Sequence, residues 1–534
     1  MAASRHTLAT PSACAANYVD SVDPSSGEVV ARFESTNPAD LPLIFERARE
    51  AQKEWASVPL RQRCATMRSL RDAIFDARAE IIGAITRETG KPRTEAIFAE
   101  VLLVLDTADF LARRAPRWLR TERVPHHNLA MKEKSGMLAY EPRGVVAIVS
   151  PWNYPFSIPM AQVIPALLAG NAVLLKPSEL TPGVGALIGD LIERAHFSKN
   201  LVQIVQGGPE LGAAIIEANP DKVFFTGSVA TGRRIAEVCG RKLIPSVLEL
   251  GGKDAMIVLA DADLEVASSA AVWGAFTNCG QACVSVERVY VANDVAESFI
   301  GLCVEKSKKL RMGPASDPDV EIGPMIRAMQ TEQVEAQLRD AVERGAKVLT
   351  GARRRPDLGP SYLEPAVVAN VDHSMQLMRD ETFGPVLPIQ VVASANEAIE
   401  LANDSPFALS ASIWTSNARA GRELAERIRA GSVMINDVAS YYGISEAPHG
   451  GRGASGWGRT HSRFGLLEMV HAKYVDVDRL PRMAKPWWFG YSEQLVVAAD
   501  RFLELLFARS WRLRWSALKD RNGVRRVIFK RNRI

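Results

Sequence analysis

Four short segments carry side chains that could act together in one reaction. They are 151–155 (PWNYP), 248–252 (LELGG), 280–283 (GQAC) and 381–385 (ETFGP). A cysteine thiol can add to a carbonyl carbon, and an asparagine amide with a backbone N–H can hold the resulting oxyanion. A carboxylate can then activate water as a general base. Each segment alone is explained as packing or a turn, but together they predict attack on a carbonyl group beside a hydride-accepting nucleotide.

The pattern of apolar runs predicts the elements that position these segments. Helical stretches separate several short apolar runs, which lie at 144–150, 171–177, 201–207, 221–227 and 246–252. This alternation is typical of βαβ units and predicts a parallel, doubly wound sheet. Helical periodicity over 40–118 precedes these runs, and a second α/β stretch at 254–445 follows them. The predicted fold class is therefore α/β.

Two glycine-rich segments are candidates for a phosphate-binding loop. The segment 451–456 (GRGASG) has GxGxxG spacing, but it follows EAPHG, which is not a strand, so we reject it. The segment 225–232 (FTGSVATG) follows the apolar run DKVFF and opens the helical stretch GRRIAEVC. Because N–H groups at a helix N-terminus bind anions, this second segment is the better candidate. By itself it is equally consistent with an ordinary strand–helix turn.

The motifs taken together resemble the aldehyde dehydrogenase superfamily, in its hydrolytic, NAD(P)-dependent form. LELGGKD and FTNCGQACVSVERVYV carry most of the resemblance, and PWNYP, LLKPSE, FTGS and ETFGPVLP occur in the family order across about 20–480. Glu249 and Cys283 lie 34 residues apart, as the family pattern requires. The resemblance implies a three-part fold, which comprises a Rossmann-like cofactor domain, an α/β catalytic domain and a small β oligomerisation arm.

The resemblance also implies catalytic roles for three residues. Cys283 would add to an aldehyde to give a thiohemiacetal, which loses hydride and becomes a thioester. Asn153 would hold the oxyanion with its side-chain amide, together with the backbone N–H of Cys283. Glu249 would activate the water that hydrolyses the thioester to a carboxylic acid.

Eight further positions are implied to bind the cofactor. Lys176 and Glu179 would hold the adenine-side ribose, and Gly227 and Ser228 the pyrophosphate. The others, which line the cleft or contact the nicotinamide end, are Pro151, Trp152, Glu381 and Phe383. A carboxylate at Glu179 accepts hydrogen bonds from a 2′-hydroxyl but repels a 2′-phosphate, which favours NAD. NADP stays open because Lys176 could meet a phosphate.

The substrate is predicted less sharply than the reaction. Tyr154 and Phe156 beside the predicted oxyanion donor favour an apolar aldehyde, either medium- to long-chain or aromatic. Succinate semialdehyde is the alternative substrate. A noncatalytic scaffold on the same fold is the alternative from another class, and the intact set of Asn153, Glu249 and Cys283 argues against it.

The expected domain boundaries follow the three-part architecture. They are 1–130 with 144–253 for the cofactor domain, 254–467 for the catalytic domain, 131–143 with 468–481 for the arm, and 482–534 for a C-terminal extension. An exposed edge strand in the arm favours pairing with a second subunit, so we expect a homodimer or homotetramer.

The C-terminal extension is a basic appendage. The whole chain has a net charge of only +4, which argues against a nucleic-acid-binding protein, yet residues 485–534 hold twelve Lys and Arg against four Asp and Glu. Apolar residues recur there three or four apart among tryptophans and arginines, which predicts an amphipathic basic helix. Peripheral contact with a membrane surface and packing on the body or a dimer partner both stay open; nucleic-acid binding by the tail is the weaker third alternative.

The remaining reactive residue types indicate compartment and local roles. Six cysteines without a CxxC pair, and no apolar leader, favour a reducing, cytoplasmic location. The eight histidines form no HExxH motif, so no metal site is predicted. Cys279 is expected to be packing, with a reversible disulfide or an inhibitory metal shared with Cys283 as the alternative. His449 could be a surface-loop residue or a substrate-tunnel residue.

Overall fold

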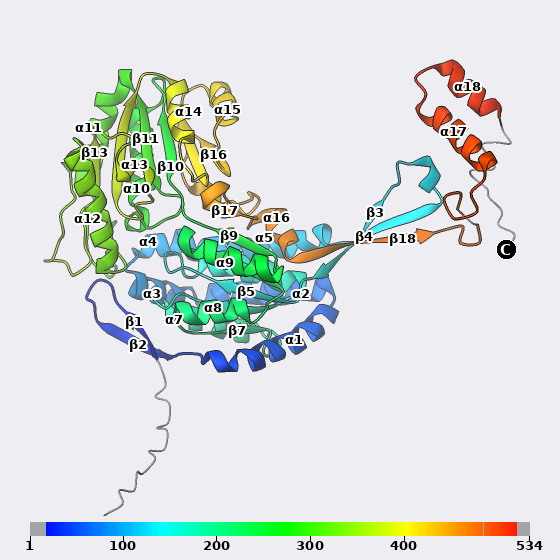
Figure 1. The fold of residues 1–534 in the computed structure, drawn as a ribbon. Coiled ribbons are helices and arrows are strands. Elements are labelled where there is room, and N and C mark those ends of the chain that lie inside the picture. The colour runs from blue at the N-terminus through cyan, green and yellow to red at the C-terminus, as the bar shows by residue number, and fades with distance from the viewer. Residues whose placement is uncertain (1–17, 484, 521–534) are drawn as a thin grey trace, which may run out of the picture. The chain divides into compact units, whose positions relative to one another are not determined.

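The computed structural model describes residues 18–483 and 485–520 (Figure 1). Two compact units divide the chain. The first comprises Met1–Trp118 and Pro142–His471, and the second Leu119–Glu141 and Ala472–Ile534. The larger unit holds two mixed sheets flanked by helices, so the predicted α/β class is confirmed.

The first unit opens with a hairpin and a set of helices. The antiparallel strands are β1 (Tyr18–Val22) and β2 (Val29–Glu34). The helical periodicity predicted over 40–118 gives five α-helices, which are α1 (Leu41–Ser57), α2 (Leu60–Asp76), α3 (Arg78–Thr89), α4 (Arg93–Ala96) and α5 (Leu102–Trp118). Apolar positions on one side of each long helix are buried, as the spacing requires. A π-helical turn at Ile97–Val101 separates α4 from α5.

A six-stranded sheet follows, in the order β17-β9-β8-β5-β6-β7. Its parallel strands coincide with the five predicted apolar runs and are β5 (Val145–Val149), β6 (Ala172–Lys176), β7 (Val202–Ile204), β8 (Lys222–Thr226) and β9 (Ser246–Glu249). The short strand β17 (Gly456–Trp457) adds to β9 in the antiparallel direction. The intervening helices are α6 (Ser157–Ala169), α7 (Pro182–Arg194), α8 (Pro209–Glu217) and α9 (Val229–Lys242). Since β5 and β6 are almost wholly buried, their sequences are continuously apolar rather than alternating.

A second, seven-stranded sheet forms from residues after Gly252. Its strands, in spatial order, are β12 (Lys347–Thr350), β13 (Ala366–Ala369), β14 (Val386–Val392), β11 (Val286–Ala292), β10 (Asp254–Val258), β15 (Ser410–Trp414) and β16 (Ser432–Ile435). Only β12 runs antiparallel to its neighbour. The helices of this region are α10 (Leu264–Phe276), α11 (Ala296–Lys309), α12 (Ala328–Glu343), α13 (Gln376–Arg379), α14 (Ala395–Asn403), α15 (Ala418–Ala425) and α16 (Ser462–Glu468). Buried aliphatic side chains of the strands and helices form one continuous core.

The second unit contains a three-stranded sheet and two helices. In the sheet, β4 (Lys134–Pro142) lies between β3 (Glu122–Val124) and β18 (Val470–Asp478). The sequence predicted a single helix in the extension, and this prediction is wrong. The extension forms two helices, α17 (Glu493–Phe507) and α18 (Trp511–Lys519). Ala508 leaves the helical conformation, with φ −59° and ψ 135°, and this break lets the two helices pack on each other. No helix in the described part of the chain is long and apolar enough to cross a bilayer.

Candidate active site

A cleft in the first unit collects most of the predicted site residues. The predicted residues in its lining are Pro151, Trp152, Asn153, Gly227, Ser228, Glu249, Cys283, Glu381 and Phe383. Several of them follow or end parallel strands of the six-stranded sheet, because the carboxyl ends of such strands share one edge. Lys176, which ends β6, and Glu179 are not in this lining.

The cleft also contains residues to which the sequence assigned no individual role. Thr226, Leu250 and Gly251 belong to the predicted motifs, whereas four residues lie outside them: Ile158, Arg327, Gln330 and Gln333. The last three come from the start of α12 or just before it, in a stretch with no motif. Tertiary packing alone brings this helix to the cleft, so no sequence signal could have identified these residues.

Cys283 follows a left-handed backbone turn at the end of α10. Asn278, Cys279 and Gly280 all have positive φ, of 51°, 55° and 70°. A Cβ on Gly280 would lie 2.2 Å from the carbonyl oxygen of Gly384, so only glycine fits there. Cys279 therefore does not stand one helical turn before Cys283; its side chain is buried in the core of the second sheet.

A carboxylate from α4 holds this turn in place. Glu95 accepts hydrogen bonds from the backbone N–H of Asn278 (2.8 Å) and the hydroxyl of Thr277 (3.0 Å). Burial raises the pKa of Glu95 to about 7, although Lys91 and these two hydrogen bonds oppose the shift. The nucleophile loop is thus fixed by a residue almost two hundred positions earlier in the chain.

Asn153 lies on a loop held by a buried ion pair. Lys91 donates to the Asn153 carbonyl oxygen (2.9 Å) and pairs with Glu100 (2.5 Å). Glu100 in turn accepts from the backbone N–H groups of Phe156 and Ser157. The Asn153 amide nitrogen donates to the carbonyl of Gln281 (3.1 Å), which ties the loop to the segment before Cys283. An NH₂ group has a second proton, which this hydrogen bond does not use.

Glu249 is buried at the end of β9. Neither of its carboxylate oxygens has a hydrogen-bond partner among the described residues. Burial raises the pKa of this carboxyl well above its usual range, and the Arg459 charge only partly offsets the effect. Burial also raises the pKa of the Cys283 thiol, with Asp254, Glu381 and Glu249 adding to the rise. Both groups therefore rest in an environment that favours their neutral forms.

His449 is buried beside Glu249, so the surface-loop alternative for this residue is wrong. Its Nε2 lies 3.6 Å from Glu249 Oε2. The ring stacks on Tyr441 and meets the edge of Tyr442, at centroid distances of 5.6 and 4.8 Å. Desolvation lowers the pKa of His449 to about 3, with the neighbouring His461 contributing. The imidazole is consequently neutral next to the carboxyl group.

The side of the cleft predicted to hold the cofactor combines a helix N-terminus, a glycine backbone and two aromatic rings. Ser228 caps α9, accepting from the N–H of Thr231, so the cleft residues Gly227 and Ser228 lie at a helix N-terminus. A Cβ on Gly227 would lie 2.6 Å from the Phe225 ring, so the backbone here has no room for a side chain. Trp152 and Phe383 meet edge to face at 5.5 Å. These features fit a pyrophosphate and an aromatic ring held in the same cleft.

The two residues outside the cleft lining lie next to each other. The ammonium group of Lys176 is 3.5 Å from the carboxylate of Glu179 and donates to the carbonyl of Pro177 (3.1 Å). Burial lowers the pKa of Lys176, and Glu179 opposes that shift. Lys176 is the last residue of β6, which pairs with β5 in the sheet.

A parallel sheet whose strand ends lead into a cleft with a thiol, an amide and a carboxylate defines an α/β enzyme of the nucleotide-binding class. Over residues 12–475 the sequence matches the aldehyde dehydrogenase family. The chain belongs to this family, as the motifs predicted, and is an NAD(P)-dependent oxidoreductase acting on aldehydes.

Different relatives are named for different aldehyde substrates. A 4,4′-diapolycopene aldehyde oxidase from Methylomonas sp is 40% identical over 491 residues, which cover 92% of this chain and 91% of that protein. A Mycolicibacterium smegmatis protein whose name proposes an NADP(+)-dependent succinate-semialdehyde dehydrogenase is 39% identical over 84% of this chain and 86% of its own length. Among solved structures, an NAD-dependent aldehyde dehydrogenase from Sinorhizobium meliloti is similar, with a TM-score of 0.84 and 32% identity, covering 88% of this chain and 93% of that one.

Proposed function

We propose that the enzyme oxidises an aldehyde to a carboxylic acid through a covalent intermediate on Cys283. The juxtaposition of Cys283, Asn153 and Glu249 in one cleft carries the proposal. The Cys283 thiol gives its proton to the Glu249 carboxylate in the same cleft, and the sulfur adds to the aldehyde carbon as a thiolate. Asn153 Nδ2 and the backbone N–H of Cys283 hold the oxygen that becomes negatively charged. Because both donors belong to fixed loops, they need no rearrangement as this charge develops.

The bound dinucleotide would supply the acceptor for the hydride that leaves the aldehyde carbon. Cys283 then carries an acyl group as a thioester. Once Glu249 has passed the thiol proton to solvent, it removes a proton from water and the hydroxide adds to the thioester carbon. The C–S bond then breaks, which releases the carboxylic acid and leaves Cys283 as a thiolate. The buried position of Glu249 supports this role, since a raised carboxyl pKa makes it a stronger base near neutral pH.

We infer that NAD is preferred over NADP. Lys176, Glu179, Gly227, Ser228, Pro151 and Trp152 are proposed to bind the adenosine and pyrophosphate portion, and Glu381 and Phe383 the nicotinamide end. The Glu179 carboxylate would repel the additional phosphate of NADP. The ion pair with Lys176 weakens that repulsion, so slow NADP turnover is expected rather than none.

The proposed substrate is an apolar aldehyde. Tyr441, which is buried, and Tyr442, which is half-buried, pack against His449 next to Glu249. Cys283 is close enough to contribute to the raised pKa of both hydroxyl groups and of Tyr154. Aromatic side chains around the thiol favour an apolar chain or ring as substrate. The relative named 4,4′-diapolycopene aldehyde oxidase supports an apolar aldehyde as the substrate. Succinate semialdehyde is the second candidate because several relatives bear that name.

An aldehyde panel tests both substrate and mechanism. Formation of NADH and NADPH would be followed with aliphatic aldehydes of increasing length, benzaldehyde and succinate semialdehyde. We expect kcat/KM to rise with chain length and activity to vanish in Cys283→Ala. Glu249→Gln should give a burst of NADH without sustained turnover. Preference for succinate semialdehyde would overturn the substrate proposal and keep the mechanism; activity in Cys283→Ala would overturn the mechanism.

We further propose that β18 mediates assembly with a second copy of the chain. β18 is the edge strand of its three-stranded sheet, and most of its side chains are exposed. An edge strand presents unpaired N–H and C=O groups that a partner strand can satisfy. A homodimer or homotetramer would cover this edge.

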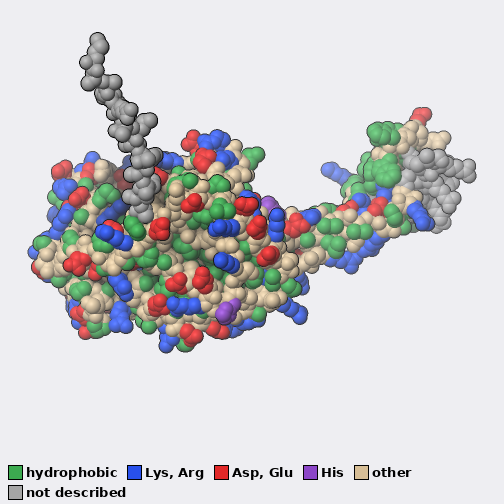
Figure 2. Space-filling view, turned by 90° about the horizontal axis from the view of Figure 1, so that it is seen from below, with side chains coloured by type: hydrophobic (Ala, Val, Ile, Leu, Met, Phe, Trp, Pro, Cys, Tyr) green, Lys and Arg blue, Asp and Glu red, His purple; other side chains and the backbone are tan. Residues whose placement is uncertain are grey.

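The C-terminal helices are proposed to contact a membrane surface peripherally. Exposed apolar side chains of the extension include Phe489 (87% exposed), which lies four residues before α17 begins, and Phe507 and Trp511 (both 71%). Figure 2 shows hydrophobic side chains gathered on this unit. Val496, Leu503 and Phe507 are spaced so that they share one face of α17. Arg512 and Arg514 alternate with Trp511, Leu513 and Trp515 in α18, a composition suited to anionic headgroups and the acyl boundary.

Liposome flotation tests this contact. The full chain should float with vesicles of anionic phospholipid, less well with neutral vesicles, and binding should fall as salt rises. Replacing Phe507, Trp511 and Trp515 by serine should abolish flotation while leaving turnover of a short, water-soluble aldehyde unchanged. No flotation of the full chain would overturn the proposal. A change of oligomer mass in the serine variant would instead assign the face to a second copy.

A reducing compartment, and hence the cytoplasm, is the proposed location. The five cysteines in the described residues are all free. The mechanism requires Cys283 as a thiolate, and an oxidising compartment would consume it.

A further inference from the structure

We propose that Glu287 is a positioning residue for the cofactor. Its buried carboxylate, paired with Lys253, holds the turn at 381–383 so that Glu381 and Phe383 face the cleft. The inference rests on the cofactor roles proposed above for those two residues. Glu287 lies on β11, four residues after the nucleophile, and is not part of the cleft lining itself.

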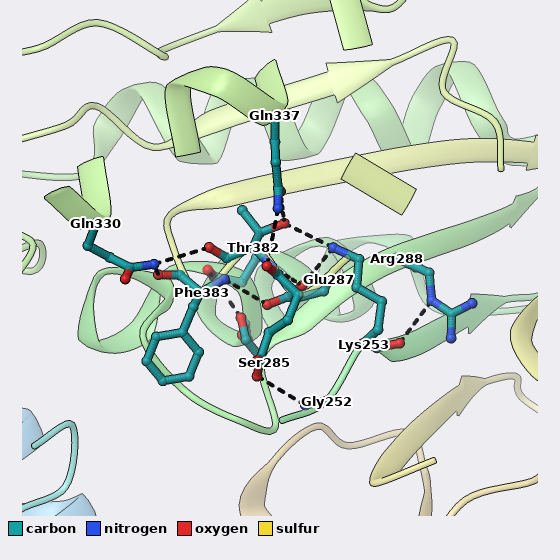
Figure 3. Close-up of polar contacts among 12 residues, drawn as sticks. Gly252, Lys253, Ser285, Glu287, Arg288, Gln330, Gln337, Thr382 and Phe383 are labelled. Carbon is teal, nitrogen blue, oxygen red and sulfur yellow. Dashed lines mark hydrogen bonds and ion pairs between the residues drawn. The ribbon is translucent and has the colours of Figure 1, made fainter. Parts of the chain in front are cut away.

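Both oxygens of Glu287 bind the backbone of the turn (Figure 3). The N–H of Thr382 donates to Oε2 (2.8 Å), and the N–H of Phe383 donates to Oε1 (3.0 Å). The Lys253 ammonium donates to Glu287 Oε2 (2.7 Å) and to the Thr382 hydroxyl (2.9 Å). All three side chains are buried. A carboxylate acceptor makes these hydrogen bonds stronger than neutral ones would be.

The turn needs such support because its backbone is strained. Phe383 has a φ of 50°, in the left-handed region that a bulky residue rarely adopts. This conformation costs free energy and persists only where the surroundings fix it. Glu287 satisfies two consecutive N–H groups at this position, one with each carboxylate oxygen.

Neighbouring side chains complete the support of the turn. Gln337 donates to the carbonyl of Glu381 (3.2 Å), and Gln330 donates to the carbonyl of Phe383 (3.3 Å). The Glu381 side chain accepts from the N–H of Gly252 (3.0 Å), directly before Lys253 in the chain. The result is that the turn and the 251–253 loop are fixed against each other, with Glu381 between them.

The charge of Glu287 also acts on Glu381. Burial raises the pKa of Glu381 to about 8, with the charges of Glu287 and Asp254 adding to the rise and Lys253 and the Gly252 N–H opposing it. An ionised Glu381 accepts ribose hydroxyl hydrogen bonds more strongly than a protonated one. Cofactor affinity should therefore weaken as pH falls through this pKa, and removal of the Glu287 charge should move that weakening to lower pH.

Titration of NADH binding by fluorescence tests the proposal without relying on turnover. In Glu287→Gln we expect the dissociation constant of NADH to rise about 10- to 100-fold, the effect of losing charge-assisted hydrogen bonds. The KM for aldehyde should change less than twofold, and the pH dependence of NADH binding should shift to lower pH. Glu335→Gln is the matched control, since Glu335 lies on α12 in an exposed ion pair with Arg354. It should bind NADH as the parent enzyme does.

Two further variants separate the outcomes. Glu381→Gln tests the cofactor role on which the inference rests: if it binds NADH normally, that role is wrong. If Glu381→Gln weakens binding and Glu287→Gln does not, the positioning role of Glu287 is wrong. Should Glu287→Gln fail to fold, Glu287→Asp keeps the charge next to Lys253 but shortens the reach. NADH affinity equal to that of the parent in Glu287→Asp would then overturn the proposal.

Discussion

Burial of Glu249 without a hydrogen-bond partner has a direct consequence for the pH dependence of catalysis. Hydrolysis of the thioester needs the ionised carboxylate, and desolvation raises the pKa of this group. As pH falls through the raised pKa, the base becomes protonated and hydrolysis slows. The loss should begin at a pH well above the value near 4 that an ordinary carboxyl group would give.

A pH–rate profile of kcat checks this expectation, provided hydrolysis limits turnover. The burst of NADH before steady state would establish that condition. Glu249→Gln should show no sustained turnover at any pH, because it has no base at this position to ionise. An inflection near pH 4 in the parent enzyme would contradict the assignment of Glu249 as the base.

Short motifs singled out each proposed catalytic side chain, but they did not indicate its environment. LELGG and GQAC identified Glu249 and Cys283, whereas nothing in the sequence placed His449 against Glu249. That contact depends on the antiparallel bridge between His449 and Thr460, formed after the chain has crossed both sheets. A lone histidine has no spacing pattern, so sequence alone left its alternatives open.

At the scale of elements, the buried Lys91–Glu100 pair is expected to contribute strongly to stability and to the oxyanion site. It links the segment around α4 to the loop carrying Asn153. Lys91→Met would leave the Glu100 carboxylate buried without its cation, at a cost of about 3–5 kcal/mol in the free energy of unfolding. Chemical denaturation measures this change. Turnover should also fall, because the Asn153 carbonyl loses its hydrogen bond.

An exposed ion pair serves as the control for that variant. Lys309 pairs with Glu305 on the surface of α11, with both side chains more than half exposed. Lys309→Met should therefore change stability by less than about 0.5 kcal/mol. Equal effects of the two substitutions would show that the buried pair has no special role.

Two glycine substitutions compare a crowded backbone position with an open one. Gly280→Ala would force a Cβ to within 2.2 Å of a carbonyl oxygen at a φ of 70°, displacing the loop before Cys283. We expect a large loss of kcat and lower stability. Gly301 lies within α11, and an added Cβ there meets nothing within 4 Å, so Gly301→Ala should stabilise the protein by about 0.5–1 kcal/mol. Thermal unfolding and steady-state kinetics check both variants.

At the scale of the whole molecule, the proposed assembly through β18 predicts a sensitivity to proline. Successive N–H groups of a strand point to opposite sides, so one of Val475→Pro and Asp476→Pro removes a donor toward the free edge. Light scattering coupled to size exclusion should show that this variant is a monomer. Unchanged mass in both variants would contradict assembly through β18.

Local patterns were enough to predict the two parallel-sheet regions, the family and the candidate catalytic motifs, because continuous apolar strands, glycine-rich turns and short runs around reactive residues are all visible in the sequence. The remaining features depend on tertiary packing. It brought Glu95, Lys91 and Glu287 to loops far away in the chain, divided the C-terminal extension into two helices, and added the start of α12 to the cleft. Contacts between distant segments have no local signature, since they arise only when the sheets have formed and packed.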